Sequence, residues 1–199
     1  MQYRLIEFSR LRDDQIKSLA HLHDSVMHTL LSDLGFPFVW RYYQIAQVDP
    51  DVIGVCAISG DVLGWAMGSP HPDRINAQLR SPWTWCAFQM LRITLTHPIV
   101  LWQLISSVIS SSNHGDVKAG AIELTYIGVA TDQRGKGIGE ALLREFLQAS
   151  RSRGYHSVVL SVEKDNPAAI SLYGKAGFKV IDTFSEGRYR RYRMELPLI

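Results

Sequence analysis

The spacing of apolar and polar residues along the chain predicts an alternation of strands and helices. Residues 3–8 alternate and predict a first strand, and apolar residues three or four apart predict a helix from Asp13 or Asp14 to about Leu31. The same patterns predict, in order, a helix over 38–46, strands over 52–58 and 62–67 around the turn Ser59-Gly60-Asp61, a strand over 123–129, a helix over 137–153, a strand over 158–162, a helix over 166–176 and strands over 178–184 and 189–196. Strands mixed with helices, with hairpins early and late, predict one α/β (α+β) domain over residues 1–199.

One apolar segment, Trp83 to Ile109, lies inside an insertion at about residues 70–119. It is interrupted by Gln89, Arg92 and the pair His97-Pro98, so no run of 18 apolar residues remains for a membrane span. Because proline disfavours helix at the preceding residue, we expect two helices that meet at Pro98. The tryptophans of this segment keep contact with a membrane surface open as an alternative.

Composition and charge narrow the class of protein. The chain is 46% hydrophobic and 20% charged, as in ordinary soluble globular proteins, and its net charge of +2 gives no overall field that favours nucleic acid. Cys56 and Cys86 have no metal-ligand spacing and are too few for a disulfide framework, so we expect two core residues and a reducing cytoplasm. The start of the chain lacks the apolar core of a signal peptide. The basic run Arg188–Arg193 is interpreted as a solvated edge strand rather than a polyanion site.

A glycine cluster follows the predicted strand 123–129 and opens the predicted helix 137–153: Arg134-Gly-Lys-Gly-Ile-Gly139. The first N–H groups of a helix have no partner within it, so strand, glycine turn and helix together predict a phosphate site. The cluster lacks the G-x-G-x-x-G spacing of a dinucleotide fingerprint and the G-K-[ST] ending of a P-loop. A short turn whose N–H groups converge on a pyrophosphate remains, with added charge from Arg134 and Lys136.

A second segment, 166–178, carries helix signals at both ends. Asn166 can cap the helix, Pro167 suits its first position and Gly177 its C-terminal cap, while Asn166 and Tyr173 share one helix face. The two segments together resemble the GNAT superfamily of N-acetyltransferases. Arg134-x-x-Gly137-x-Gly139 is similar to the acyl-CoA signature of that superfamily, and the run from Asn166 through Ala169 and Tyr173 to Gly177-Phe178 is similar to its later motif.

This resemblance implies a mostly antiparallel central sheet flanked by helices and an enzyme that moves an acetyl group from acetyl-CoA to a primary amine, without a metal. It makes Glu123 the candidate base and Tyr173 the candidate acid at the departing thiolate. The alternatives are a solvated carboxylate at the strand edge for Glu123 and a core aromatic residue for Tyr173. Backbone groups of 127–129 are expected to face the pantetheine amides and the acetyl carbonyl. The resemblance implies these CoA-binding residues: Ile127, Gly128, Val129, Arg134, Gly135, Lys136, Gly137, Ile138, Gly139, Glu140 and Asn166.

The acceptor half of the reaction stays open. A small molecule or a protein can supply the amine, and a CoA-binding module without transferase activity is the competing interpretation. His21, Asp24 and His28 share a helix face that we interpret as polar lining of the acceptor cleft rather than a metal site, because a third strong ligand is missing. Relatives in the superfamily often dimerise through late strands, which makes 189–194 a candidate dimer edge.

Overall fold

The fold has three layers with a mixed sheet in the middle. A computed structural model describes residues 3–27, 29–82, 84, 87–89, 117–186 and 189–198 of the 199-residue chain, and these ranges form one seven-stranded sheet in the order β1-β2-β3-β4-β5-β7-β6. Its strands are β1 (Arg4–Glu7), β2 (Ile53–Ser59), β3 (Asp61–Ser69), β4 (Ala121–Val129), β5 (Ser157–Glu163), β6 (Lys179–Glu186) and β7 (Tyr189–Pro197). All neighbouring strands pair antiparallel except β4 and β5. The expected mixed, mostly antiparallel sheet flanked by helices is confirmed.

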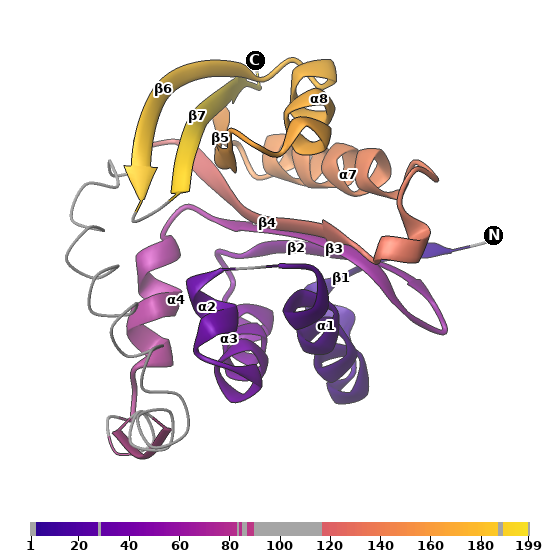
Figure 1. The fold of residues 1–199 in the computed structure, drawn as a ribbon, viewed down its shortest axis with the longest axis vertical. Helices are drawn as coiled ribbons and strands as arrows, with labels where there is room; N and C mark the ends of the chain where they lie inside the picture. The colour runs from indigo at the N-terminus through magenta and orange to yellow at the C-terminus, as the bar shows by residue number, and fades with distance from the viewer. Residues whose placement is uncertain are drawn as a thin grey trace.

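Helices cover both faces of the sheet (Figure 1). One face carries α1 (Asp13–Val26), α2 (Leu30–Asp33), α3 (Phe36–Val48) and α4 (Pro72–Leu79), and the other carries α7 (Ile138–Ser152) and α8 (Pro167–Lys175). The short 3₁₀ helices η1 (Phe8–Arg10) and η2 (Thr131–Gln133) follow β1 and β4. Each face has its own apolar core, so the central strands are apolar on both sides.

The first helices differ from the sequence expectation at their ends. Arg12, rather than Asp13 or Asp14, is the N-cap of α1, and its backbone N–H donates to Oε1 of Gln15 at 3.0 Å. The helix ends at Val26 instead of Leu31. Gly35, with φ of 88°, precedes α3 and lets that helix begin at Phe36, two residues before the predicted start.

The insertion begins with a helix that the sequence patterns did not predict. α4 buries Ile75 and Leu79 against the core shared by α1 and α3, and Pro72 occupies its first turn, where a missing N–H costs nothing. The two helices expected over 83–109 lie almost entirely outside the described residues, as does Cys86. Cys56 is fully buried, as predicted for a core residue, and burial raises the pKa of its thiol.

A β-bulge in β4 changes which residues share a face. Met67 of β3 pairs with Tyr126 and Gly68 pairs with Leu124, so Thr125 has no opposite residue in β3. Strict alternation would place Leu124 and Tyr126 on the same face of the sheet. With the bulge, Leu124 packs in the core under α7, and Tyr126 packs in the core under α1 and α3.

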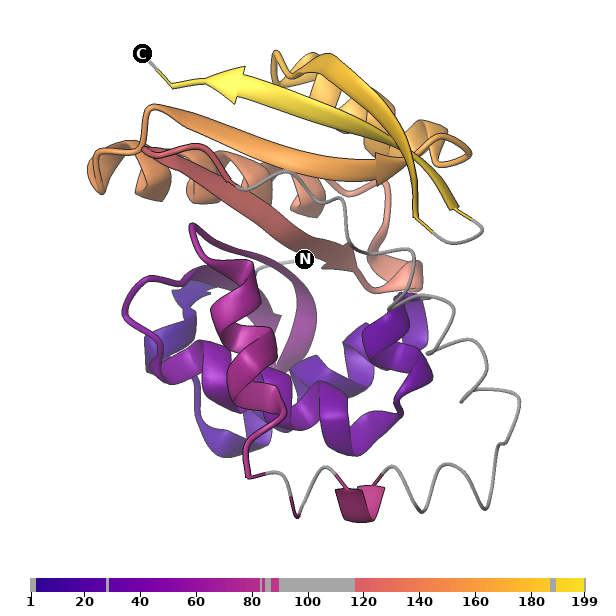
Figure 2. The same cartoon turned by 90° about the vertical axis from the view of Figure 1, so that its left-hand side faces the viewer.

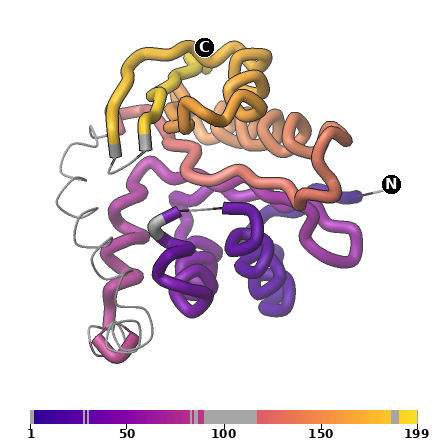
Figure 3. Tube along the Cα trace, viewed as in Figure 1, coloured from indigo at the N-terminus to yellow at the C-terminus, as the bar shows by residue number. Residues whose placement is uncertain are grey.

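The sheet splits between β4 and β5. The two strands pair over four residues, Ala121–Leu124 against Ser157–Leu160, although β4 continues to Val129 along β3 and β5 continues to Glu163 along β7. Figure 2 shows the two strands side by side at one end and apart at the other. The tube in Figure 3 shows the loop from β4 into α7 at the separated end. Backbone groups of the last residues of β4 therefore face a gap in hydrogen bonding rather than a neighbouring strand.

The last two strands correct a prediction. β7 lies between β5 and β6, so 189–194 is an interior strand, and β6 is the edge. The edge position predicted for the basic run is therefore wrong, and the predicted solvation is wrong for Arg191 and Arg193, whose side chains are only 21% and 16% exposed. Both arginines point to one face because they are two residues apart in a strand.

His23 is a buried titratable group on the α1 side of the core. Its side chain is 0% exposed, and its ring nitrogens lie 2.7 Å from Tyr43 Oη and 3.3 Å from Thr29 Oγ1. Burial lowers the pKa of His23 to about 4, against an ordinary 6.5. The neutral ring is therefore the form that the folded chain stabilises.

We expect this histidine to make stability depend on pH. A base whose pKa is depressed by folding contributes its full stability above about pH 6.5 and loses it as the pH falls toward 4, a loss of about 3 kcal/mol. Urea unfolding across this window measures the slope. His23→Gln should flatten the slope, while His21→Gln, at an exposed ring stacked on Phe36, should leave it unchanged. An unchanged slope in His23→Gln would show that other groups cause the dependence.

Candidate functional site

The glycine cluster forms a turn with free backbone donors at the start of α7. Gly135 and Gly137 have φ of 75° and 78°, and Gly137 is the left-handed N-cap of the helix. Within the described chain, the N–H groups of Ile138, Gly139 and Glu140 have no hydrogen-bond acceptor, as expected for the first turn of a helix. Ile138 is buried and anchors the turn, so these donors are held in place beside exposed solvent. The arrangement suits a phosphate group.

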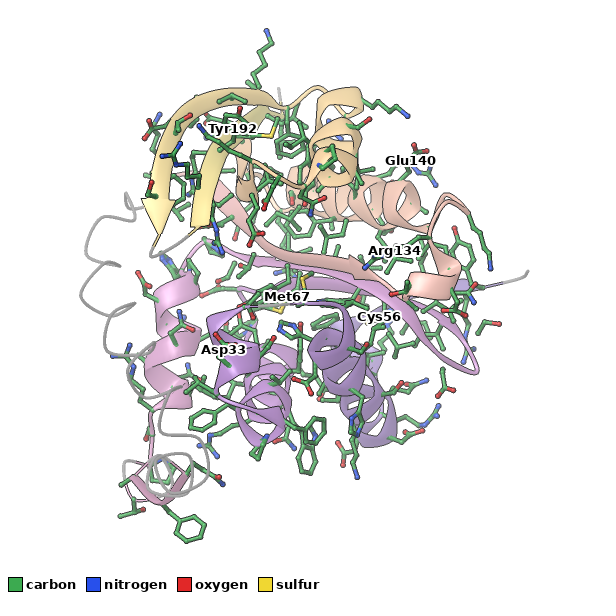
Figure 4. All side chains as sticks on the ribbon, viewed as in Figure 1. Asp33, Cys56, Met67, Arg134, Glu140 and Tyr192 are labelled. Carbon is green, nitrogen blue, oxygen red and sulfur yellow. The ribbon has the colours of Figure 1, made fainter. Side chains whose placement is uncertain are left out.

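Two exposed cations border this turn. Arg134 Nε donates to the carbonyl of Val129 at 3.3 Å, and Lys136 Nζ donates to Oε1 of the buried Gln133 at 2.9 Å. Figure 4 labels Arg134 beside the end of β4 and Glu140 at the start of α7. Both cations are thereby held near the free N–H groups, where they add attraction for an anion.

Glycine occupies the three positions of the cluster for different physical reasons. Gly135 and Gly137 are favoured by their positive φ, because a Cβ on either would meet nothing within 4 Å and only backbone strain opposes a side chain there. A Cβ on Gly139 would make ordinary contacts, 3.7 Å to Leu172 and 3.8 Å to Val129. The structure therefore accommodates alanine at Gly139 without strain, whereas a side chain at Gly137 has room but strains the backbone.

The end of β4 brings the predicted residues 127–129 to the split in the sheet. Ile127 and Val129 pack toward α7, and Gly128 faces the opposite core. A Cβ on Gly128 would lie 2.5 Å from the Trp65 ring. This glycine is therefore needed for packing of the aromatic core, a reason that the sequence did not show.

Gly128→Ala should accordingly destabilise the fold. Its new methyl group overlaps a fully buried indole that has no free space to enter, and overpacking of this kind costs about 1–3 kcal/mol. Thermal unfolding measures the loss, with Gly139→Ala as the control that should melt like the wild type. Equal melting temperatures for the two variants would contradict the packing role.

Asn166 and Tyr173 lie on α8, as predicted. Asn166 caps the helix, because its Oδ1 accepts from the N–H of Ala169 at 3.0 Å, and it remains exposed. Tyr173 is 6% exposed and packs in the core under α7 with its ring 5.8 Å from that of Phe178. Burial raises the pKa of the Tyr173 hydroxyl above its ordinary value, so the phenol keeps its proton at neutral pH.

Glu123 does not stand alone at the start of β4. Arg193 of β7 donates to both of its carboxylate oxygens, Nη1 to Oε1 at 2.5 Å and Nη2 to Oε2 at 3.3 Å. Arg193 Nη1 also lies 3.0 Å from Oγ of Ser161 on β5. The carboxylate lies on the α3 side of the sheet: burial of Tyr42 raises the pKa of the Tyr42 phenol, and the nearby charges of Tyr126 and Glu123 raise it further. Sequence reasoning missed Arg193, because a basic run in a strand gave no sign of a partner 70 residues earlier.

An aromatic cluster lies beside Glu123 on the same face. The Tyr126 ring contacts those of Tyr42 at 5.7 Å and His23 at 4.9 Å, both edge-on. Tyr42 and Tyr43 are fully enclosed between α3 and the sheet, and burial raises the pKa of both phenols. Aromatic residues recur along α3 at helical spacing, which was the available sequence signal for this lining. The predicted base and the predicted acid thus lie on opposite faces of the sheet. Glu123 lies with the aromatic cluster, and Tyr173 lies under α7.

The remaining predicted features can be placed only in part. His21 and Asp24 are exposed on α1, and His28 lies outside the described residues. Within the described ranges no three histidine, cysteine or acidic side chains gather in a way that could hold a metal ion. In those same ranges no helix combines the length and the apolar character that a membrane crossing requires.

Comparison with known proteins gives a family and a fold. The model of the Acetyltransferase (GNAT) family matches residues 19–178. The L-methionine sulfoximine/L-methionine sulfone acetyltransferase of Pseudomonas aeruginosa is 29% identical over 136 residues, 65% of this chain and 76% of that protein. Mycothiol acetyltransferase of Saccharomonospora viridis is 43% identical over 61 residues, 31% of this chain and 20% of that protein.

Solved structures agree with this fold. The Salmonella typhimurium protein YncA, solved with acetyl-CoA, has a TM-score of 0.64 at 15% identity, over 100% of this chain and 95% of that one. The PaiA N-acetyltransferase of Thermoplasma acidophilum, solved with coenzyme A, has a TM-score of 0.61 at 15% identity, over 99% of both chains.

Proposed function

The chain belongs to the Acetyltransferase (GNAT) family and is an N-acetyltransferase, and from this premise we propose that it moves the acetyl group of acetyl-CoA to the primary amine of a small molecule. The observation that carries the proposal is the split sheet with a phosphate turn at its open end. The β4–β5 pairing stops at Leu124, and the free N–H groups of 138–140 come after β4, η2 and the glycine turn. A long, thin ligand with a pyrophosphate at one end fits this arrangement.

CoA binding is assigned to the residues around the split. The pyrophosphate accepts hydrogen bonds from the start of α7, with Arg134 and Lys136 supplying positive charge. The pantetheine amides pair with the backbone of 127–129, replacing the strand neighbour that β4 lacks there. Asn166, at the exposed start of α8, contacts the arm on its other side with the amide nitrogen that capping leaves unused.

The chemical step is a direct attack of the amine on the thioester. Glu123 takes a proton from the acceptor ammonium, because an amine with a pKa of about 8–10 is mostly protonated at neutral pH. The new N–C bond forms as the carbonyl becomes an oxyanion, which β4 backbone N–H groups stabilise. The C–S bond then breaks, and Tyr173 gives its proton to the departing thiolate. The second proton on the new amide nitrogen returns to the Tyr173 oxygen, and Glu123 releases its proton to solvent, so both groups are restored. A phenol carries its proton at neutral pH, so Tyr173 is in the form that this role requires.

The positions of the two groups also support these roles. Glu123 lies on the face of α1 and α3, and Tyr173 packs under α7 on the other face. The split between β4 and β5 is where a thioester can be approached from both faces. The acceptor then enters from the side of the aromatic cluster, and the sulfur lies toward α8.

We assign a small-molecule acceptor because the names of two relatives contain the small molecules methionine sulfoximine and mycothiol. The test follows thiol release from acetyl-CoA with amino acids, amino sugars, polyamines and short peptides. We expect release with at least one small amine and none with the hydroxyl analogue of that amine. Release with peptides alone would overturn the small-molecule assignment.

A further inference from the structure

The ion pair between Glu123 and Arg193 joins three strands at the place where the sheet splits. Glu123 lies opposite Val159 of β5, and Arg193 of β7 lies opposite Ser161 of the same strand. The guanidinium therefore reaches across β5 to hold a carboxylate on β4. The two side chains are 16% and 18% exposed, so the pair is largely removed from water.

Stability alone is a weak explanation for this pair. Removing two charges from water costs about as much as their attraction returns, so an enclosed ion pair adds little net stability relative to apolar residues of similar size. The geometry is nevertheless specific: both guanidinium nitrogens meet both carboxylate oxygens, and Ser161 fixes the guanidinium from a third strand. Such a fork sets the orientation of the carboxylate plane.

We propose that Arg193 is a positioning residue that holds the Glu123 carboxylate oriented for proton transfer from the acceptor amine. This inference rests on the proposed role of Glu123 as the base. Each carboxylate oxygen keeps a second lone pair, which is free to accept the proton of an amine. Arg193 from β7 and Tyr42 from α3 are the titratable or charged groups that the structure places beside Glu123. Arg193 is the cation of these two and the group that meets both carboxylate oxygens, so its loss removes the contact that fixes the carboxylate plane.

The experiment compares Arg193→Met, Arg193→Lys and Ser161→Ala with the wild type. Arg193→Met should lower kcat about 10- to 100-fold, because a misoriented base loses much of the general-base contribution. The KM for acetyl-CoA should stay within about twofold. The pH profile of kcat/KM should differ from that of the wild type, because the charge that faces the base is gone. Arg193→Lys should recover part of the loss, and Ser161→Ala should show a smaller loss of the same kind.

Two controls distinguish a positioning role of Arg193 from an unspecific loss of structure or activity. Arg190→Met removes an exposed arginine of the same strand and should leave kcat and the pH profile unchanged. In a Glu123→Gln background, Arg193→Met should cause no further loss, because the group that it positions is already gone. If Arg193→Met destabilises the fold, Ser161→Ala still tests the pair through its kcat and pH profile.

Three outcomes decide the matter. The positioning role is supported if Arg193→Met lowers kcat only where Glu123 is present and also changes the pH profile of kcat/KM. An unchanged kcat in Arg193→Met, or an equal additional loss in the Glu123→Gln background, overturns it while the transferase activity of the wild type stands. A wild-type protein that releases no thiol with any amine overturns the proposed function itself, and this inference with it.

Discussion

Gly137→Leu should raise the Kd for CoA at least about 100-fold, a loss equal to one or two hydrogen bonds to a charged phosphate. The space around an added Cβ at Gly137 is empty of protein atoms, and Gly137 directly precedes the free N–H groups of 138–140 in the chain. A leucine side chain there occupies the volume assigned to the pyrophosphate. Calorimetric titration with CoA measures the change.

Gly154→Leu is the matched control for this prediction. Gly154 has φ of 80° and nothing within 4 Å of an added Cβ, so it imposes the same kind of backbone strain as Gly137. It follows the other end of α7, far from the phosphate turn. Both variants should lose about 1–2 kcal/mol of folding stability. Only Gly137→Leu should lose affinity for CoA. Retained affinity in Gly137→Leu would refute the phosphate assignment.

Tyr173→Phe should lower the rate of thiol release in a single turnover by about 100-fold or more, the range expected for loss of a general acid. The ring stays in place against Phe178, so packing in the core under α7 is preserved. Its hydroxyl has no hydrogen-bond partner within the described chain, so its removal breaks no contact inside the protein. CoA affinity should therefore stay within about twofold of the wild-type value.

Tyr155→Phe serves as the comparison for Tyr173→Phe. Tyr155 precedes β5 and is away from both the phosphate turn and the split in the sheet, so its variant should turn over at the wild-type rate. A Tyr173→Phe rate equal to that of the wild type would remove Tyr173 from the chemical step. A rate loss matched by an equal loss of CoA affinity would assign the residue to binding instead.

Much of the fold follows from local sequence signals. The glycine at the cap of α7, the capping residue Asn166 of α8 and the turn at Gly60 each act through the conformation of a few neighbouring residues. Such signals need no knowledge of the rest of the chain, which is why the glycine turn before α7 and the cap of α8 could be predicted from the sequence.

The acceptor half depends on contacts that no local pattern contains. The bulge at Thr125 exchanges the faces of the residues after it, and only the pairing with β3 reveals it. Arg193 meets Glu123 because β7 inserts between β5 and β6, a topology that places a late residue beside an early one. Gly128 is required by the indole of Trp65 from the neighbouring strand. These three features are tertiary, and they set the shape and charge of the face where the acceptor is proposed to bind.

The fate of the acetyl group tests the proposed transfer from acetyl-CoA to an amine most directly. Acetyl-CoA carrying an isotopic label in the acetyl group is incubated with the protein and an amine that supports thiol release, and the products are identified by mass spectrometry. We expect one labelled acetyl group on the amine nitrogen for every thiol released. Tight CoA binding with no acetylated amine from any acceptor would contradict it, and would leave a CoA-binding module of the same fold.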